Sequence, residues 1–109
     1  MTNINTTKKY RFYIGLNDKD TGKQLLSINQ VTNIIDNVFE CYTIINAQGR
    51  YKYFDGHFEN ENTLIIEFFD LLNEIKDKKT LKNIIRYLKT QLNQELILVE
   101  ITKVNIDMQ

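Results

Sequence analysis

Proline is absent from this chain of 109 residues, and glycine occurs only four times. Proline and glycine interrupt helices and strands more often than other residues do, so their scarcity leaves most element boundaries to the hydrophobic pattern. Cysteine occurs once, at Cys41. A single cysteine excludes both an internal disulfide and a zinc motif built on paired cysteines.

An excess of charge and long hydrophobic runs are also missing. Fourteen basic and fourteen acidic residues leave a formal net charge of +0, which gives no general attraction to nucleic acid or to an anionic membrane. No apolar run approaches the roughly 20 residues of a membrane span, and the polar start of the chain lacks the apolar region of a signal peptide. We therefore expect no membrane partner, and a nucleic-acid partner is disfavoured.

The composition that is present suits one small domain. Apolar residues make up 42% of the chain and charged residues 26%, which is enough for one hydrophobic core and a solvated surface. The abundant Ile, Asn and Lys have codons rich in A and T, which is typical of an AT-rich bacterial or phage genome. We expect a flexible N-terminal tail over residues 1–8 and a single domain over residues 9–109, located in the cytoplasm of a bacterial host cell.

The hydrophobic periods predict alternating strands and helices. Ser27 and Gln30 form a capping-box pattern that opens a helix ending near Phe39, and a second helical stripe begins at Thr80. The segment 70–79 is compatible with either a helical turn or a loop. Strands are predicted at residues 10–16, 41–47, 63–69 and 95–106.

This order predicts an α+β two-layer sandwich of the ferredoxin-like βαββαβ type. A turn at Gln48-Gly49 and a short strand at Arg50–Phe54 would add one hairpin strand, followed by a turn at Asp55-Gly56. Right-handed crossovers place both helices on one face of the antiparallel sheet. The last strand has apolar residues on both faces, so we expect a homodimer or higher oligomer to cover the open face. The alternative is that the hairpin or the segment 70–79 folds over it.

The aromatic and basic residues of the hairpin are the best candidates for binding. Arginine and tyrosine together suit phosphate pairing and base stacking, and Lys and Arg also protect edge strands from pairing with other chains. The candidate ligand- or partner-binding residues are Arg11 and Tyr13 on the first predicted strand, and Arg50, Tyr51, Tyr53 and His57 in the hairpin.

His57 is the only histidine and has Asp55, Glu59 and Glu61 as neighbours. Histidine acts as a general base near neutral pH, yet no nucleophile stands in a recognisable motif with it. The spacing of these carboxylates matches no zinc motif, and no glycine-rich phosphate loop is present. We therefore assign no catalytic residue, no metal ligand and no cofactor.

Two stretches, FYIGL near the start and YTIINAQGRYKYFDGHFENENTLIIEF in the middle, carry a family resemblance. Together they resemble a small bacterial and phage-associated domain family of unknown function with a ferredoxin-like fold. The resemblance implies that fold and implies no catalytic residue. The matching positions are Gly15, Thr43, Ala47, Gly49, Tyr51 and Glu61.

The sequence thus favours a small non-enzymatic binding protein that acts as an oligomer. One form of this hypothesis is a phage or mobile-element inhibitor of host defence, which occupies a host protein or sequesters a small nucleotide-type ligand. An alternative is a small enzyme in which His57, Tyr51 and Arg50 line a cleft between protomers. An RNA-binding module is a further alternative, although the aromatic RNA-recognition motif is absent.

Overall fold

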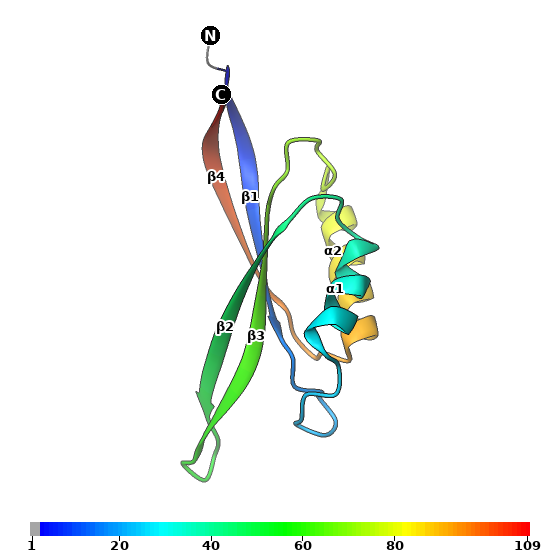
Figure 1. Ribbon diagram of the computed structural model, residues 1–109, viewed down its shortest axis with the longest axis vertical. Coiled ribbons are helices and arrows are strands. Elements are labelled where there is room, and N and C mark those ends of the chain that lie inside the picture. The colour runs from blue at the N-terminus through cyan, green and yellow to red at the C-terminus, as the bar shows by residue number, and fades with distance from the viewer. Residues whose placement is uncertain (1–2) are drawn as a thin grey trace.

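Four antiparallel strands form one sheet, and two helices cover one of its faces (Figure 1). The strand order β2-β3-β1-β4 is that of the ferredoxin-like βαββαβ arrangement, so the expected α+β two-layer sandwich is confirmed. The computed structural model describes residues 3–109. In chain order the elements are β1 (Asn3–Gly15), α1 (Ile28–Asp36), β2 (Thr43–Lys52), β3 (Phe58–Phe69), α2 (Lys78–Leu92) and β4 (Leu98–Met108).

The core lies between the helices and the two central strands. Successive side chains of a strand point to opposite faces, so the even-numbered residues Phe12 of β1 and Phe68 of β3 both point toward the helices. Phe39, which follows α1, packs between them, with ring centroids 5.5 Å from Phe12 and 4.5 Å from Phe68. The fully buried side chains are Phe12, Ile14, Val31, Ile35, Leu64, Ile66 and Leu88.

Side-chain caps define where the two helices begin. The Ser27 hydroxyl accepts a hydrogen bond from Gln30 N at 3.2 Å, and the Gln30 side chain accepts one from Ser27 N at 2.8 Å. This is the predicted capping box, although α1 ends at Asp36, earlier than expected. Asp77 caps α2 by accepting from Thr80 N at 2.7 Å, so α2 begins two residues before Thr80.

The strands are longer than the helices that cover them. In Figure 1 the β1–β4 pair extends past the helices toward the termini, and the β2–β3 hairpin extends past them in the opposite direction, which makes the molecule 57 Å long and only 26 Å wide. The tail expected over residues 1–8 is wrong from Asn3 onward, because Asn3 pairs with Met108 at the end of β4. Residues 1–2 lie outside the described residues, and the single domain over residues 9–109 stays a prediction.

The hairpin has two strands, and the extra strand expected at Arg50–Phe54 is wrong. Gly49 pairs with Glu61 in the middle of the ladder, so no turn forms at Gln48-Gly49 and β2 continues to Lys52. The turn comes instead at Asp55-Gly56, as predicted, where Gly56 N donates to the Tyr53 carbonyl at 3.0 Å. Gly56 has a φ of 91°, a conformation that favours glycine.

The segment that the sequence left open is a loop up to Asp77. The Asp70 carboxylate accepts hydrogen bonds from the backbone N–H groups of Glu74 at 2.6 Å and Ile75 at 3.0 Å. These bonds satisfy the backbone without helical pairing. Ile75 is buried at 6% exposure and anchors the loop on the core.

A matched pair of isoleucines tests this packing. Ile66 and Ile44 pair across β3 and β2 on the helix side, but Ile66 is 0% exposed and Ile44 is 38% exposed. We expect Ile66→Ala to lower the free energy of unfolding by about 2–5 kcal/mol, because it leaves a cavity. Ile44→Ala should cost less than half as much. Urea denaturation measures both, and equal losses would contradict the assigned core.

Candidate functional site

The face of the sheet away from the helices, here called the open face, carries the odd-numbered residues of β1, β2 and β3 and the even-numbered residues of β4. Figure 1 shows both helices on the opposite side. Part of this face is apolar and solvent-exposed: Phe69 is 41% exposed and Leu98 is 64% exposed, while Ile45 and Ile65 are half-buried. Such a surface suits a contact with another molecule.

Arg11 does not stand free on this face. Its Nε lies 2.5 Å from Glu67 Oε2 across the β1–β3 pair, and the side chains are 31% and 15% exposed. A guanidinium so close to a carboxylate is neutralised locally, so an incoming phosphate would have to displace Glu67. This pairing weakens the phosphate-binding role that the sequence left open for Arg11.

Tyr13 reaches in the other direction, toward β4. Its hydroxyl donates to Glu100 Oε1 at 2.7 Å, which fixes the phenol edge and leaves the Tyr13 ring as part of the open face. A carboxylate beside an aromatic ring is a combination that recognises cationic ligands.

Glu61 lies over the end of β1, where Gly15 leaves room for it. A Cβ on Gly15 would come within 2.4 Å of the Glu61 carboxylate, and that carboxylate accepts from Asn17 N at 2.9 Å. The φ of Gly15 is not in the left-handed region, so the glycine contributes space here: an added Cβ would push aside the Glu61 carboxylate, which is the end of a flexible side chain. The space beside Gly15 therefore lets the Glu61 carboxylate lie at the edge of the open face.

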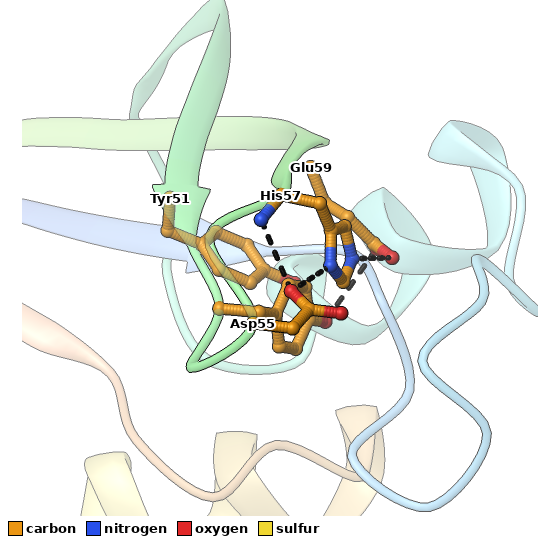
Figure 2. Close-up of polar contacts among 5 residues, drawn as sticks. Tyr51, Asp55, His57 and Glu59 are labelled. Carbon is orange, nitrogen blue, oxygen red and sulfur yellow. Dashed lines mark hydrogen bonds and ion pairs between the residues drawn. The ribbon is translucent and has the colours of Figure 1, made fainter.

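The hairpin carries a cluster of aromatic and acidic side chains on one side, shown in Figure 2. The rings of Tyr53 and His57 stack with centroids 4.6 Å apart, and the Tyr51 and Tyr53 hydroxyls are 3.1 Å apart. His57 Nε2 lies 3.2 Å from Glu59 Oε1, and Nδ1 contacts the Asp55 carboxylate. Three of the predicted site residues, Tyr51, Tyr53 and His57, thus come together.

Neighbouring groups in this cluster raise the pKa values of His57 and Tyr53. Asp55 first, and Glu59 second, raise the pKa of His57 above its ordinary value, because each carboxylate accepts a hydrogen bond from the ring. The Tyr51 hydroxyl, followed by burial and the charge of Glu59, raises the pKa of Tyr53 to about 12. Both ring nitrogens of His57 are occupied, so the imidazole is arranged to hold a proton and not to remove one.

Arg50 lies on the opposite side of the hairpin from that cluster. Its guanidinium carbon sits 4.7 Å from the centroid of the Phe58 ring, and Lys52 Nζ sits 5.8 Å from the same centroid. Arg50 also donates to Asn60 Oδ1 at 2.9 Å. The hairpin therefore has an acidic aromatic side and a basic aromatic side.

The six predicted site residues do not form one site within a single chain. Tyr13 pairs with Ile65, whereas Tyr51 pairs with Glu59, which is six positions further along β3 and so roughly 20 Å away at about 3.3 Å per residue. Sequence reasoning also missed the acidic character of the open face. The sequence of β3 could have shown this acidic character, because its odd-numbered residues, which share one face, include Glu59, Glu61 and Glu67.

Within residues 3–109, no group of three or more His, Cys, Asp or Glu side chains is placed to hold a metal ion. No helix of the described chain is long and apolar enough to cross a membrane.

The fold is shared with solved structures. A phage S-adenosylmethionine lyase in complex with S-methyl-5'-thioadenosine is 20% identical over 94% of this chain and 88% of its own, with a TM-score of 0.65. A phage S-adenosylmethionine lyase in the apo state is 19% identical over 94% and 89%, with a TM-score of 0.62. CutA from Synechococcus elongatus is 10% identical over 97% and 85%, with a TM-score of 0.54. At these identities the likeness establishes the fold.

No protein-family model and no curated protein sequence matches the chain. The resemblance to a small ferredoxin-like family thus holds at the coarse level of fold, with phage proteins among the structural neighbours.

His57 offers a direct test of the hairpin cluster, because it is the only histidine and gives one imidazole signal. Titration by NMR should give a pKa above the ordinary value of about 6.5, and Asp55→Asn should lower that pKa. The pKa of His57 is higher in the folded chain than in the unfolded chain, so protonated His57 stabilises the fold. This stabilisation is complete below the pKa of the unfolded chain and is lost as the pH rises through the pKa of the folded chain. Asp107→Asn, on a distant strand, should leave the His57 pKa unchanged. An ordinary pKa in the unaltered chain would contradict the contacts of His57.

Gly15→Ala tests the position of Glu61. The added methyl group must displace the Glu61 carboxylate and break its part-buried hydrogen bond to Asn17 N, which should cost about 0.5–1.5 kcal/mol of unfolding free energy, the net value of one hydrogen bond. In a Glu61→Ala background the same glycine substitution should cost much less. A double-mutant cycle by urea denaturation measures this difference, and additive losses would show that Glu61 does not occupy the space beside Gly15.

Proposed function

We propose that this chain is a small binding protein for a cationic nucleoside of the S-adenosylmethionine type, and that it acts as an oligomer. The observation that carries the proposal is the acidic and aromatic character of the open face. On that face the carboxylates Glu59, Glu61, Glu67 and Glu100 outnumber the cations Lys9 and Arg11.

This balance favours a cation over a phosphate. Arg11 is already paired with Glu67, so the open face presents little free positive charge to a phosphate. Glu100 and the ring of Tyr13 lie side by side and would attract a sulfonium or ammonium group. An adenine ring would stack on tyrosine, and a carboxylate such as Glu61 would accept hydrogen bonds from the ribose hydroxyls. The fold shared with phage S-adenosylmethionine lyase supports the same ligand class.

An oligomer would supply what one chain lacks. Small-molecule sites are concave and bury most of the ligand, whereas the open face is one side of a sheet. A second copy laid against Ile45, Ile65 and Leu98 would bury their apolar surface and enclose a pocket between the protomers. In a phage-infected bacterial cytoplasm, such a protein would act on host defence by withdrawing a nucleoside-type ligand from solution.

A lyase is the second candidate, favoured by the fold of the two lyase structures. In that reaction the bond between the sulfonium sulfur and the methionine Cγ breaks, and the sulfur keeps the electron pair as a neutral thioether. The four-carbon fragment closes through its own carboxylate, one oxygen of which forms a bond to Cγ as the sulfur leaves. His57, in a cleft between protomers, would then hold a proton near the reacting group.

Isothermal titration calorimetry with three probes tests the ligand class. S-adenosylmethionine should bind more tightly than S-methyl-5'-thioadenosine, which lacks the sulfonium charge, and adenosine monophosphate should bind most weakly. Glu100→Gln should weaken S-adenosylmethionine about fivefold, as expected for ~1 kcal/mol from an exposed charge, and should change the neutral thioether little. Asp107→Asn serves as the matched control. Preference for adenosine monophosphate would overturn the proposal.

Chromatography of S-adenosylmethionine incubated with the protein separates the two candidates. Release of S-methyl-5'-thioadenosine in proportion to protein and time would establish the lyase, and its loss in His57→Ala would place His57 in the reaction. Tight binding with the ligand recovered intact would establish the binding protein.

A further inference from the structure

The tip of the β2–β3 hairpin presents apolar and basic groups together. Phe54 is 113% exposed, so its ring touches almost nothing of its own chain, and Phe58 is 50% exposed. Lys52 lies beside both, with its Nζ over the Phe58 ring. Two exposed phenyl rings flanked by cations at the end of a projecting arm indicate a contact surface.

The other end of the same hairpin has the complementary surface. A cavity of about 270 Å³ lies where β2 begins, β3 ends and the following loop starts. Its apolar wall includes Phe69, Leu71 and Leu72, and Leu72 is 73% exposed. A cavity of about 150 Å³ is enough for a benzene-sized group, so a phenyl ring fits here.

Four carboxylates line this cavity, and one of them, Glu67, is already paired with Arg11. Glu40, Asp70 and Glu74 all line it, and among residues 3–109 no lysine or arginine lies within ion-pair distance of any of them. Burial, and then the charges of Glu40 and Asp70, raise the pKa of Glu74. A cation from outside would relieve this repulsion.

We propose that the hairpin tip of one copy docks in this cavity of the next copy, with Phe54 in the apolar floor and Lys52 facing Glu40 and Glu74. The occupant is a second copy because this chain itself carries the matching pair of features, an acidic apolar cavity and a hairpin tip with one basic aromatic side, where Lys52 and Arg50 lie against Phe58 while Asp55 and Glu59 lie on the other side. Tip and cavity lie at opposite ends of one hairpin, so the contact is head-to-tail. Head-to-tail contacts close into rings when the rotation between copies permits, and otherwise extend into filaments.

This inference rests on the oligomeric part of the proposed function but adds a contact between copies that is separate from the one at Ile45, Ile65 and Leu98, and it does not depend on the ligand. The contact involves neither Tyr13 nor Glu100, which carry the cation-binding argument. Oligomeric mass measured without ligand therefore tests the contact, and calorimetry tests the ligand, so either can fail alone.

Sedimentation velocity over a concentration series measures the association. The unaltered chain should form a discrete oligomer, and Phe54→Ala should raise the dissociation constant by at least about tenfold, as expected for an aromatic anchor. Lys52→Glu and Glu74→Lys should each weaken association, and the double variant Lys52→Glu/Glu74→Lys should recover it. Lys82→Glu, an exposed position on α2, is the control for charge alone. Circular dichroism shows that each variant remains folded.

Cys41 gives an independent measurement, because this single exposed thiol lines the cavity. In Asp55→Cys, which keeps the Phe54 anchor, a short bismaleimide should link the new thiol to Cys41 of another copy, and Asp55→Cys/Cys41→Ser should lose that product. Lys82→Cys is the control for random collision. A monomer at every concentration, or an oligomer unaffected by Phe54→Ala and not crosslinked, would overturn the inference. Phe54 variants that leave oligomerisation unchanged while losing capture of another protein would assign the tip to that protein instead.

Discussion

The packing of Phe12, Phe39 and Phe68 is the interaction on which the rest of the structure depends. The three rings join β1, β3 and the segment after α1 within 4.5–6.1 Å, and they bury one face of the central strands beneath the helices. Because side chains alternate across a strand, this burial also decides which residues face away. Burying Phe12 places Arg11 and Tyr13 on the open face, and burying Phe68 places Glu67 opposite Arg11. The open face is therefore a consequence of the core.

The open face and the two projecting arms follow from a mismatch in length. The helices cover only the middle of the sheet, so the β2–β3 hairpin extends beyond them with polar and aromatic residues on both of its sides. One side holds His57 between two carboxylates, and the other holds Lys52 and Arg50 against Phe58. A thin sheet that exposes one face and two ends has more surface for partners than a closed sandwich has. The same mismatch in length therefore exposes both the open face, where the ligand is proposed to bind, and the hairpin tip, which is proposed to contact another copy.

Local patterns in the sequence predicted some elements well and others poorly, for physical reasons. The capping box at Ser27 and the turn at Asp55-Gly56 depend on neighbouring residues only, and both were found where expected. Gly49 suggested a turn but lies in the ladder opposite Glu61, because cross-strand pairing outweighs the local preference of glycine. Asn3 likewise belongs to β1 only because Met108, at the far end of the chain, pairs with it.

Alternation along the chain was enough to assign the ferredoxin-like order and to place Tyr51 and Tyr53 on one side of the hairpin and Arg50 on the other, since strand period is a local property. Tertiary structure alone decided which charged and polar groups lie next to one another. Glu67 neutralises Arg11, Glu100 holds Tyr13, and Glu61 occupies the space that Gly15 leaves, although each pair is more than 40 residues apart. Electrostatic pairing depends on distance in space, and the register of β1 against β3 and β4 sets that distance.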